Sequence, residues 1–197
     1  LGLKGVRRII TRHSLADFLD LCGQMRFQIR WGQTPRIPST SVLGHMLMVA
    51  CITFFLTRQL ESPCPKRLYN NFFGALFHDL PEAVTRDIIS PVKRSVAEFE
   101  EVIKDIEEEM VEDEIYSLLD PTWGEELSYF TRDEFSCKVV LDRDVKAVDS
   151  GVINREYNRD GFSPYDGEIV KMADLLAGFL EAYVSIKNGV STPHLLK

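Results

Sequence analysis

An adjacent histidine and aspartate, His78 and Asp79, end an apolar stretch and are the residues best suited to chemistry. The stretch reads FFGALFHDLPEAV, and the acidic residues Glu82 and Asp87 follow within nine positions of the histidine. An imidazole nitrogen and a carboxylate oxygen side by side suit a borderline or hard divalent cation. The pair alone also fits a histidine at a helix end followed by an N-capping aspartate, so other residues must decide between the two interpretations.

Two further titratable residues lie in apolar helical patterns, where a charged group is costly. His45 lies in SVLGHMLMVACITFFL, and Asp174 lies in EIVKMADLLAGFLEAY. A buried carboxylate requires a cation, a hydrogen-bond partner or a functional reason. A single histidine on such a face is more often a hydrogen-bonded core residue, but the His-Asp pair favours a shared site. The sequence therefore predicts one divalent-ion site with the ligands His45, His78, Asp79 and Asp174. Asp149, in KAVDSG, is the alternative to Asp174.

A loop upstream of these residues carries cations and a large aromatic ring. The segment RWGQTPRIPSTS contains two prolines and a glycine, which favour a loop. Arg30 and Arg36 offer guanidinium groups for a phosphate, and Trp31 offers a flat ring for a base or a sugar. The alternative is that Trp31 fills the edge of the core and the arginines are solvated.

Helical periodicity dominates the chain and predicts the elements that must position these residues. The expected helices cover residues 15–29, 41–60, 68–80, 92–119, 124–131, 135–157 and 169–186, with Ser14 capping the first and Thr40 or Ser41 the second. Small residues at Gly74 and Ala75 are expected to leave space beside His78, and Pro81 to force a kink or a new helix. The 92–119 helix has a strongly acidic face, which favours a solvated surface over a partner site. Few convincing strands remain, so the predicted fold is an all-α, single-domain helical bundle.

Length and composition restrict the class of protein. A chain of 197 residues, 45% hydrophobic and 27% charged, is expected to form one globular domain over residues 1–197. Its net charge of -7 argues against binding to nucleic acid polymers or anionic membranes. The cysteines lack paired spacing, and neither a signal peptide nor an apolar run of about 18 residues occurs, which predicts a cytoplasmic protein. The first residue is Leu rather than Met, which indicates a trimmed or originally longer chain.

The order His, His-Asp and Asp, each on an apolar helical segment, resembles the HD-domain superfamily of metal-dependent phosphohydrolases. The 5'-deoxyribonucleotidase branch is the most similar, through the motifs Arg30-Trp31, TSVLGH, ALFHDLPE, TRDIISPVK and KMADLLAGF. The resemblance runs from about Arg30 to Tyr183 and implies removal of the 5'-phosphate from deoxyribonucleoside monophosphates. Mn, Co, Zn and Mg are all candidates for the single ion, because mixed nitrogen and oxygen ligands do not select among them.

The residues near the expected ion can be given roles in phosphate-ester hydrolysis. Glu82 would orient or deprotonate the attacking water and Asp87 would protonate the leaving oxygen, although the two roles could be exchanged. Arg30 would bind the phosphate, with help from Lys93 in the SPVK segment. By resemblance, Trp31 would lie against the nucleoside sugar.

One position departs from the resemblance. Family members often have a glutamate directly before the first metal-binding histidine, and this chain has Gly44 there. The expected consequence is loss of a hydrogen bond behind the metal ligand, which bears on substrate choice more than on metal binding.

Two other functions remain open from the sequence. The ester could belong to a nucleoside triphosphate, a cyclic nucleotide or a guanosine polyphosphate, although Ala83 stands where the last class usually has an aspartate. The fold could also serve only as a non-catalytic interaction module. Family members are often dimers, and the apolar segment Val42 to Leu60 also predicts a homodimer.

Overall fold

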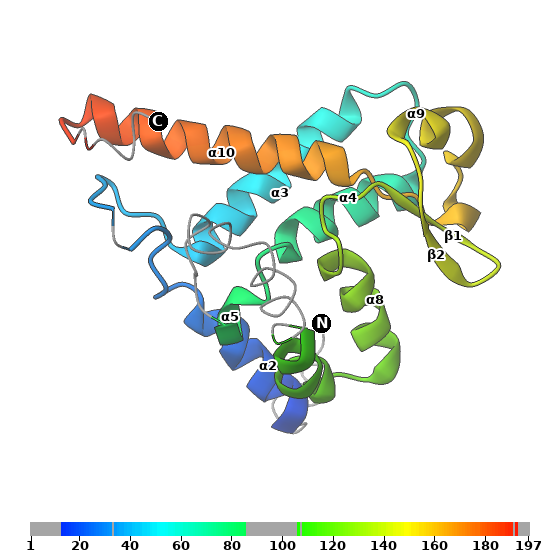
Figure 1. Ribbon diagram of the computed structural model, residues 1–197, viewed down its shortest axis with the longest axis horizontal. Helices are drawn as coiled ribbons and strands as arrows, with labels where there is room; N and C mark the ends of the chain where they lie inside the picture. The colour runs from blue at the N-terminus through cyan, green and yellow to red at the C-terminus, as the bar shows by residue number, and fades with distance from the viewer. Residues whose placement is uncertain (1–12, 33, 86–105, 107, 191, 193–197) are drawn as a thin grey trace, which may run out of the picture.

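The computed structural model describes residues 13–32, 34–85, 106, 108–190 and 192. Most of this part of the chain is helical, as predicted (Figure 1). The longer helices are α2 (His13–Gln24), α3 (Val42–Arg58), α4 (Pro65–Phe77), α8 (Pro121–Thr131) and α10 (Gly167–Lys187). The short helical segments are α5 (Glu82–Thr85), η1 (Tyr116–Leu118), α9 (Ser150–Val152), η2 (Ile153–Tyr157) and η3 (Asp160–Phe162), and residues 108–114 are also helical.

Local sequence signals mark the first turns of the helices around the candidate site, although α4 and α8 each begin three residues before the predicted Leu68 and Gly124. The hydroxyl of Ser41 accepts a hydrogen bond from the Gly44 amide at 3.1 Å and caps α3. Pro65 and Pro121 occupy the first turns of α4 and α8, where a missing amide hydrogen costs nothing. A turn containing Pro81 separates α4 from α5, as predicted. Most of the predicted 92–119 helix lies outside the described residues.

The first helix ends earlier than predicted. α2 already includes Ser14, the predicted cap, and it stops at Gln24. The chain then turns and pairs with the residues that precede α3, through a bridge between Ile29 and Ser41. Within this bridge the Arg30 amide donates to the Thr40 carbonyl at 2.9 Å. The pairing holds Arg30 at the start of α3, close to His45.

The helix predicted over residues 135–157 is wrong for residues 138–147, whereas residues 150–157 are helical in α9 and η2. Strands β1 (Lys138–Leu141) and β2 (Asp144–Ala147) form an antiparallel hairpin over residues 138–147, with Leu141 opposite Asp144. Asp142 and Arg143 form the two-residue loop, and both have positive φ, 52° and 74°, as tight hairpin turns require. Short apolar runs such as KVVL do not distinguish a helix from a strand by periodicity, and their β-branched residues favour the strand.

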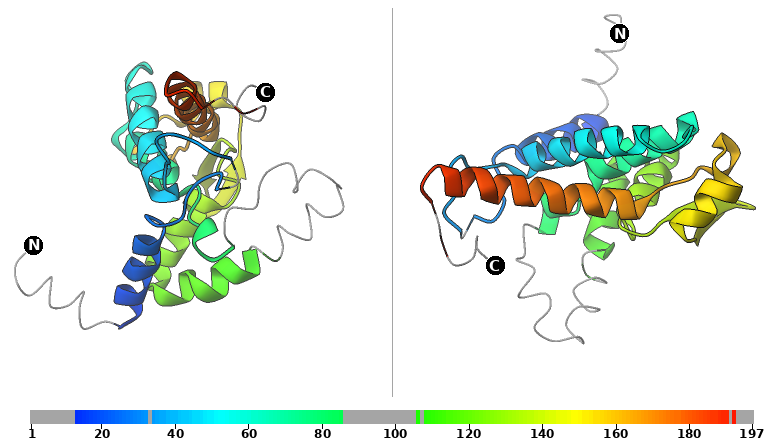
Figure 2. Two further views of the ribbon diagram at one scale, coloured as in Figure 1. Left: turned by 90° about the vertical axis from the view of Figure 1, so that its left-hand side faces the viewer. Right: turned by 90° about the horizontal axis from the view of Figure 1, so that it is seen from above.

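Helices α3 and α10, together with the end of α4, carry the candidate ligands and pack against one another. α10 runs antiparallel to α3, and both pack against α4 (Figures 1 and 2). One core cluster includes Phe18, Met25, Val42, Met46, Leu80, Val111, Ile115, Tyr116, Leu127 and Phe130, and a second includes Val49, Ala50, Ala75, Tyr165, Val170, Ala173 and Ala177. His45 lies on α3 next to Met46 of the first cluster and one turn before Val49 of the second. None of the helices in the described part of the chain is both long and apolar enough to span a bilayer.

A buried ion pair attaches the start of α10 to α4. The guanidinium of Arg67 donates to both carboxylate oxygens of Asp166, at 2.7 Å from Nε and 2.6 Å from Nη2. Asn71 donates to the same carboxylate at 2.7 Å and accepts from the Asp166 amide at 2.8 Å. The Asp166 carboxylate is therefore hydrogen bonded by Asn71 as well as paired, whereas Nη1 of Arg67 is buried and has no hydrogen-bond partner among the described residues.

The space beside Gly74 is filled by an aromatic ring. A Cβ atom at this position would lie 2.1 Å from Cε2 of Tyr165, so only glycine allows the ring to approach α4. The predicted space beside Gly74 therefore exists, and the core residue Tyr165 occupies it.

Candidate metal centre

Four side chains from α3, α10 and the end of α4 bring their donor atoms together. Nε2 of His45 lies 2.9 Å from Oδ1 of Asp174 and 3.9 Å from Oδ2 of Asp79. Nε2 of His78 lies 3.2 Å from Oδ2 of Asp79 and 3.9 Å from Oδ1 of Asp174. Donor atoms bonded to one ion at about 2.1 Å are separated by about 3.0 Å in octahedral geometry and about 3.4 Å in tetrahedral geometry. The donor atoms of His45, His78 and Asp79 all lie within 4.8 Å of one another, as the ligands of one ion would, and Oδ1 of Asp174 lies within 3.9 Å of both histidines.

The hydrogen bonds behind the two histidines direct Nε2 of each ring into this cluster. Nδ1 of His78 donates to the Ala75 carbonyl at 2.8 Å, which leaves the lone pair on Nε2. That Nε2 atom is buried and has no hydrogen-bond partner among the described residues. Nδ1 of His45 lies 2.9 Å from a carboxylate oxygen of Glu181, which favours the same tautomer. The orphaned nitrogen and the mixed nitrogen and oxygen donors fit a divalent ion.

The electrostatics of the cluster favour positive charge. Burial opposes protonation of His78, but the charge of Asp79, whose Oδ2 lies 3.2 Å from Nε2, and the charge of Asp174 prevail and raise the pKa of His78 to about 9. Burial raises the pKa of Asp174, but the hydrogen bond with His45 and the neighbouring positive charges outweigh it and lower that pKa. The pKa of Asp79 is also lowered, since the effects of His78 and Arg30 exceed that of burial. Both carboxylates are therefore ionised and available to a cation.

Arg30 lies directly against the candidate ligands. Its Nη1 is 3.2 Å from Oδ2 of Asp79, and its Nη2 is 3.4 Å from Oδ1 of Asp174. The side chain is 12% exposed, so the interpretation of a solvated arginine is wrong for this residue. The guanidinium thus reaches the same two oxygens that point into the metal cluster.

Trp31 lies beside Arg30 and is fixed by α10. Its backbone has φ 52°, which is rare for a bulky residue and costs of order 1–3 kcal/mol unless the surroundings impose it. The guanidinium of Arg36 stacks at 4.5 Å from the ring centroid, and a Cβ at Gly178 would lie 3.6 Å from the ring. Nη1 of Arg36 in turn lies 2.7 Å from Oε2 of Glu181. The ring is half-buried, against α10 rather than in either core cluster.

Glu181 connects the metal cluster to the Trp31 loop and is absent from the predicted site. One of its carboxylate oxygens binds Nδ1 of His45, and the other binds Arg36. The sequence does contain a signal, because Asp174 and Glu181 are the only charged residues between Met172 and Ile186 and lie seven positions apart on one helix face. Although Gly44 lacks a carboxylate, the expected loss of a hydrogen bond behind His45 does not occur, since α10 supplies that bond.

Replacing Glu181 with Ala is expected to weaken metal binding by about 10–100-fold, because His45 loses the group that fixes its tautomer. Glu181→Gln keeps an acceptor for Nδ1 and is expected to retain most of the affinity. Glu168, exposed in the first turn of α10, provides a matched control through Glu168→Ala. Chelator competition measures all three variants. Equal affinities in Glu181→Ala and Glu168→Ala would show that Glu181 does not orient the ligand.

A cleft of about 160 Å³ opens beside the cluster. Its lining consists of His78, Asp79, Pro81, Glu82, Thr85, Glu108, Val111, Tyr116, Thr131, Arg132, Asp133 and Glu134. Glu82, a predicted catalytic residue, thus shares a cavity with two candidate ligands. The other predicted residues near it, Asp87 and Lys93, lie outside the described residues. Asp149, the alternative ligand, is the exposed N-cap of α9, with Oδ1 2.8 Å from the Gly151 amide.

Glu134 is a second acidic residue of this cleft and was not predicted. Burial is the main cause that raises the pKa of its carboxyl group, and the charge of Asp79 adds to it. Its backbone carbonyl accepts a hydrogen bond of 2.6 Å from the Tyr165 hydroxyl, which fixes the segment. The polar sequence TRDEFS has no periodic pattern that would have placed Glu134 in the cleft.

A mainly helical fold that gathers His, His-Asp and Asp from three helical elements is the arrangement expected of an HD-type domain. Residues 22–197 match the HD domain family, and the chain therefore belongs to that family. A search of curated protein sequences found no match.

Three solved structures share this fold. An HD-domain phosphohydrolase from Listeria innocua aligns with 92% of this chain and 74% of its own, with a TM-score of 0.66 and 17% identity. A protein from Pyrococcus horikoshii OT3 aligns with 90% of this chain and 82% of its own, with a TM-score of 0.57 and 20% identity. A conserved hypothetical protein from Pyrococcus furiosus aligns with 90% of this chain and 86% of its own, with a TM-score of 0.54 and 19% identity. At sequence identities of 17–20%, the similarity to these structures is evidence of a shared fold alone.

Proposed function

We propose that the chain is a metal-dependent phosphohydrolase that removes the 5'-phosphate of deoxyribonucleoside monophosphates in the cytoplasm. The main support is the convergence of His45, His78, Asp79 and Asp174, with the guanidinium of Arg30 placed on both carboxylates. The structural neighbour from Listeria innocua is described as an HD-domain phosphohydrolase, which supports the reaction class. The motifs around Arg30-Trp31 and His78-Asp79 favour the nucleotide substrate by resemblance.

In this proposal the four converging residues hold one ion, with Mn, Co, Zn and Mg as candidates. When bound, a divalent ion supplies Lewis acidity, which favours ionisation of water at neutral pH and offsets charge on a phosphoryl group. Arg30 binds the phosphate through its guanidinium, for which it would exchange part of its present contact with Asp79 and Asp174. Trp31 lies beside it, held at positive φ, and packs against the sugar.

Glu82 is the proposed group that accepts a proton from the attacking water as the bond between phosphorus and the 5' oxygen breaks. A proton from Asp87 then completes the hydroxyl of the released nucleoside, or the two carboxyl groups act in the reverse order. Lys93 remains the proposed second cation for the phosphate. The reaction converts a phosphate monoester and water into an alcohol and inorganic phosphate.

A panel of nucleotides tests the proposal after chelation and reconstitution with each candidate metal. We expect phosphate release from deoxyribonucleoside 5'-monophosphates to exceed release from ribonucleoside monophosphates, triphosphates and 3'-monophosphates. Turnover confined to a triphosphate, a cyclic nucleotide or a guanosine polyphosphate would favour another HD phosphohydrolase. Full metal loading without turnover of any ester would favour an interaction module.

We further propose that the chain forms a homodimer through the outer surface of α3 and α10. These adjacent helices expose a series of apolar side chains: Leu47, Met48, Phe54, Phe55, Met172, Leu175, Leu176, Phe179, Leu180, Tyr183 and Val184. Their exposed area is on the order of 1,000 Å², against roughly 800 Å² that each partner buries in a standard interface. The two charged groups of α10 between Met172 and Ile186 face the metal cluster, so this stretch of the described helix presents no charge that would oppose a second copy.

Charge placed on this surface is expected to produce monomers. The double variant Leu175→Glu, Phe179→Glu puts two acids at positions that are 64% and 63% exposed. The monomer is therefore expected to fold, while repulsion between the glutamates of two copies prevents their association. Trp123→Glu on α8 replaces another large exposed side chain and is expected to remain dimeric. Light scattering across micromolar concentrations measures the masses. A monomeric mass for the unmodified chain would rule out the dimer.

A further inference from the structure

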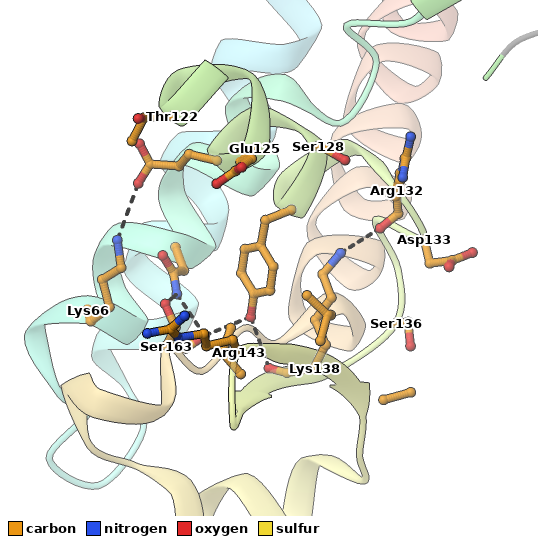
Figure 3. A pocket seen from close by; sticks show the side chains of 16 residues that line it. Lys66, Thr122, Glu125, Ser128, Arg132, Asp133, Ser136, Lys138, Arg143 and Ser163 are labelled. Carbon is orange, nitrogen blue, oxygen red and sulfur yellow. Dashed lines mark hydrogen bonds and ion pairs between the residues drawn. The ribbon is translucent and has the colours of Figure 1, made fainter. Parts of the chain in front are cut away.

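A second and larger cavity lies beside the metal cleft, between α4, α8 and the β-hairpin (Figure 3). Its volume is about 890 Å³, which is within the usual range of small-molecule sites. Arg132 and Asp133 line both cavities, so the segment after α8 forms their common wall. None of the predicted catalytic or metal-binding residues lines this second cavity.

Lys138 places a buried ammonium group in the lining. The residue is 4% exposed, and none of the ion pairs among the described residues includes it. Nζ donates one hydrogen bond, to the Arg132 carbonyl at 2.5 Å (Figure 3), and lies 4.8 Å and 5.1 Å from the ring centroids of Tyr165 and Tyr129. An ammonium has three donors, so within the described part of the chain this cation has no directly paired carboxylate and has donors without an acceptor.

The charge of Lys138 persists at neutral pH. Burial lowers its pKa to about 8, although the charges of Asp133 and Glu134 raise it. A buried cation that keeps its charge without a directly paired carboxylate favours an anion from outside the chain.

Asn70 supplies a second unsatisfied group in the same lining. The side chain is 1% exposed, and its amide nitrogen donates to the carbonyls of Ser163 and Pro164 at 2.9 Å and 3.0 Å. Its Oδ1 atom is buried and accepts no hydrogen bond from the described residues. The carbonyl contacts fix the orientation of the amide, so the orphaned oxygen cannot be exchanged for the nitrogen without losing both bonds. A ligand that satisfies Oδ1 must carry an O–H or N–H donor.

The remaining lining favours a polar anion. It contains the cations Lys66, Arg132, Lys138 and Arg143 and the acids Glu125, Glu126 and Asp133, a small positive excess in a chain of net charge -7. Lys66 is paired with Glu126 at 3.3 Å, whereas Arg143 extends from the hairpin loop, and no ion pair of the described residues includes it. Ser128, Ser136 and Ser163 add hydroxyl groups.

We propose that this cavity binds a small organic anion that also carries hydroxyl or amino donors, held by the ammonium of Lys138 and by Oδ1 of Asn70. Sugar phosphates and hydroxy acids have this chemistry. The site is independent of the proposed phosphatase activity, because it shares only its wall with the metal cleft.

An NMR titration with sn-glycerol 3-phosphate as the probe tests the proposal. The residues Val140, Val145 and Ala147 line this cavity and not the metal cleft, so their backbone amide signals are the probes chosen for it. We expect saturable shifts of these signals in the unmodified protein and an affinity lower by about tenfold or more in Lys138→Met. Arg30→Ala is the control at the metal cleft and is expected to leave the titration of these three amides unchanged.

A second measurement needs no variant. The pKa of the Lys138 amine, followed by NMR in the unmodified protein, is expected to rise when the probe is added, because a bound anion stabilises the ammonium. Absence of saturable shifts at the hairpin amides, an unchanged affinity in Lys138→Met or an unchanged amine pKa would each overturn the proposal. So would a titration that Arg30→Ala abolishes, since the probe would then bind only at the metal cleft.

Discussion

Replacing Asp174 is expected to abolish binding of the divalent ion, whereas replacing Asp149 is expected to leave it intact. Asp174 lies 2.9 Å from Nε2 of His45 at the centre of the cluster, and Asp149 caps a distant short helix at the surface. Loss of a direct ligand exceeds the 10–100-fold effect typical of the residues behind ligands, so we expect a loss of more than about 100-fold. Metal content after reconstitution and gel filtration measures the difference.

The substitution Asp174→Asn separates loss of the ligand from loss of structure. It keeps the shape of the side chain and a hydrogen bond to His45, so the fold is expected to persist while the ionic ligand is gone. Asp149→Ala removes only a cap, which costs about 1 kcal/mol and leaves the cluster untouched. Loss of metal in Asp149→Ala together with full binding in Asp174→Asn would show that the ligand set is wrong.

Glu82→Ala is expected to lower kcat by a factor on the order of 10²–10⁴ while metal content and melting temperature stay close to those of the unmodified protein. Glu82 lines the cleft beside His78 and Asp79 but is not needed to complete the four converging donors. Steady-state kinetics with the best nucleotide of the panel, combined with metal analysis, measures the effect. Glu125→Ala, which removes an exposed acid in the second cavity, is the matched control.

Arg30→Ala gives a different kinetic signature. Removal of a contact to the ground-state phosphate is expected to raise KM, and kcat falls as well if the contact strengthens in the transition state. Glu82 acts on the water and Arg30 acts on the phosphate, so Glu82→Ala and Arg30→Ala should differ in how they change kcat and KM. Near-normal turnover in both would mean that the reaction takes place elsewhere in the protein.

The fold was predictable where apolar periodicity extends over several turns. The segments that became α3, α8 and α10 were predicted within a few residues, because a long amphipathic or apolar pattern admits few other structures. The hairpin around Asp142 was missed, since each strand is only four residues long and its turn lacks the usual Asn-Gly or Asp-Gly signal. The early end of α2 was also missed, because pairing of residues 28–30 with the start of α3 is a tertiary effect.

The centre of the site was predictable for a different reason. His45 and Asp174 are polar residues in apolar helical patterns, which is unfavourable unless they meet a partner, and the structure brings them within 2.9 Å. Glu181 could have been found from its seven-residue spacing to Asp174. Glu134 could not, because only the three-dimensional path of the segment after α8 brings it to the cleft.

The attachment of α10 at Asp166 has a consequence for the rotation of this helix about its axis. Each residue of an α-helix advances about 1.5 Å and turns about 100°, so a slip by one position would replace Asp174 with Leu175 in the metal cluster. The small residues Ala173, Ala177 and Gly178 on the inner face offer shallow contacts that would tolerate such a slip better than large interlocking side chains. Arg67 holds the helix at Asp166, and His45 and Arg36 hold it again at Glu181, about 22 Å further along. The two polar attachments, at Asp166 and Glu181, therefore set both the axial position of α10 and its rotation about its own axis. Asp174 lies between them.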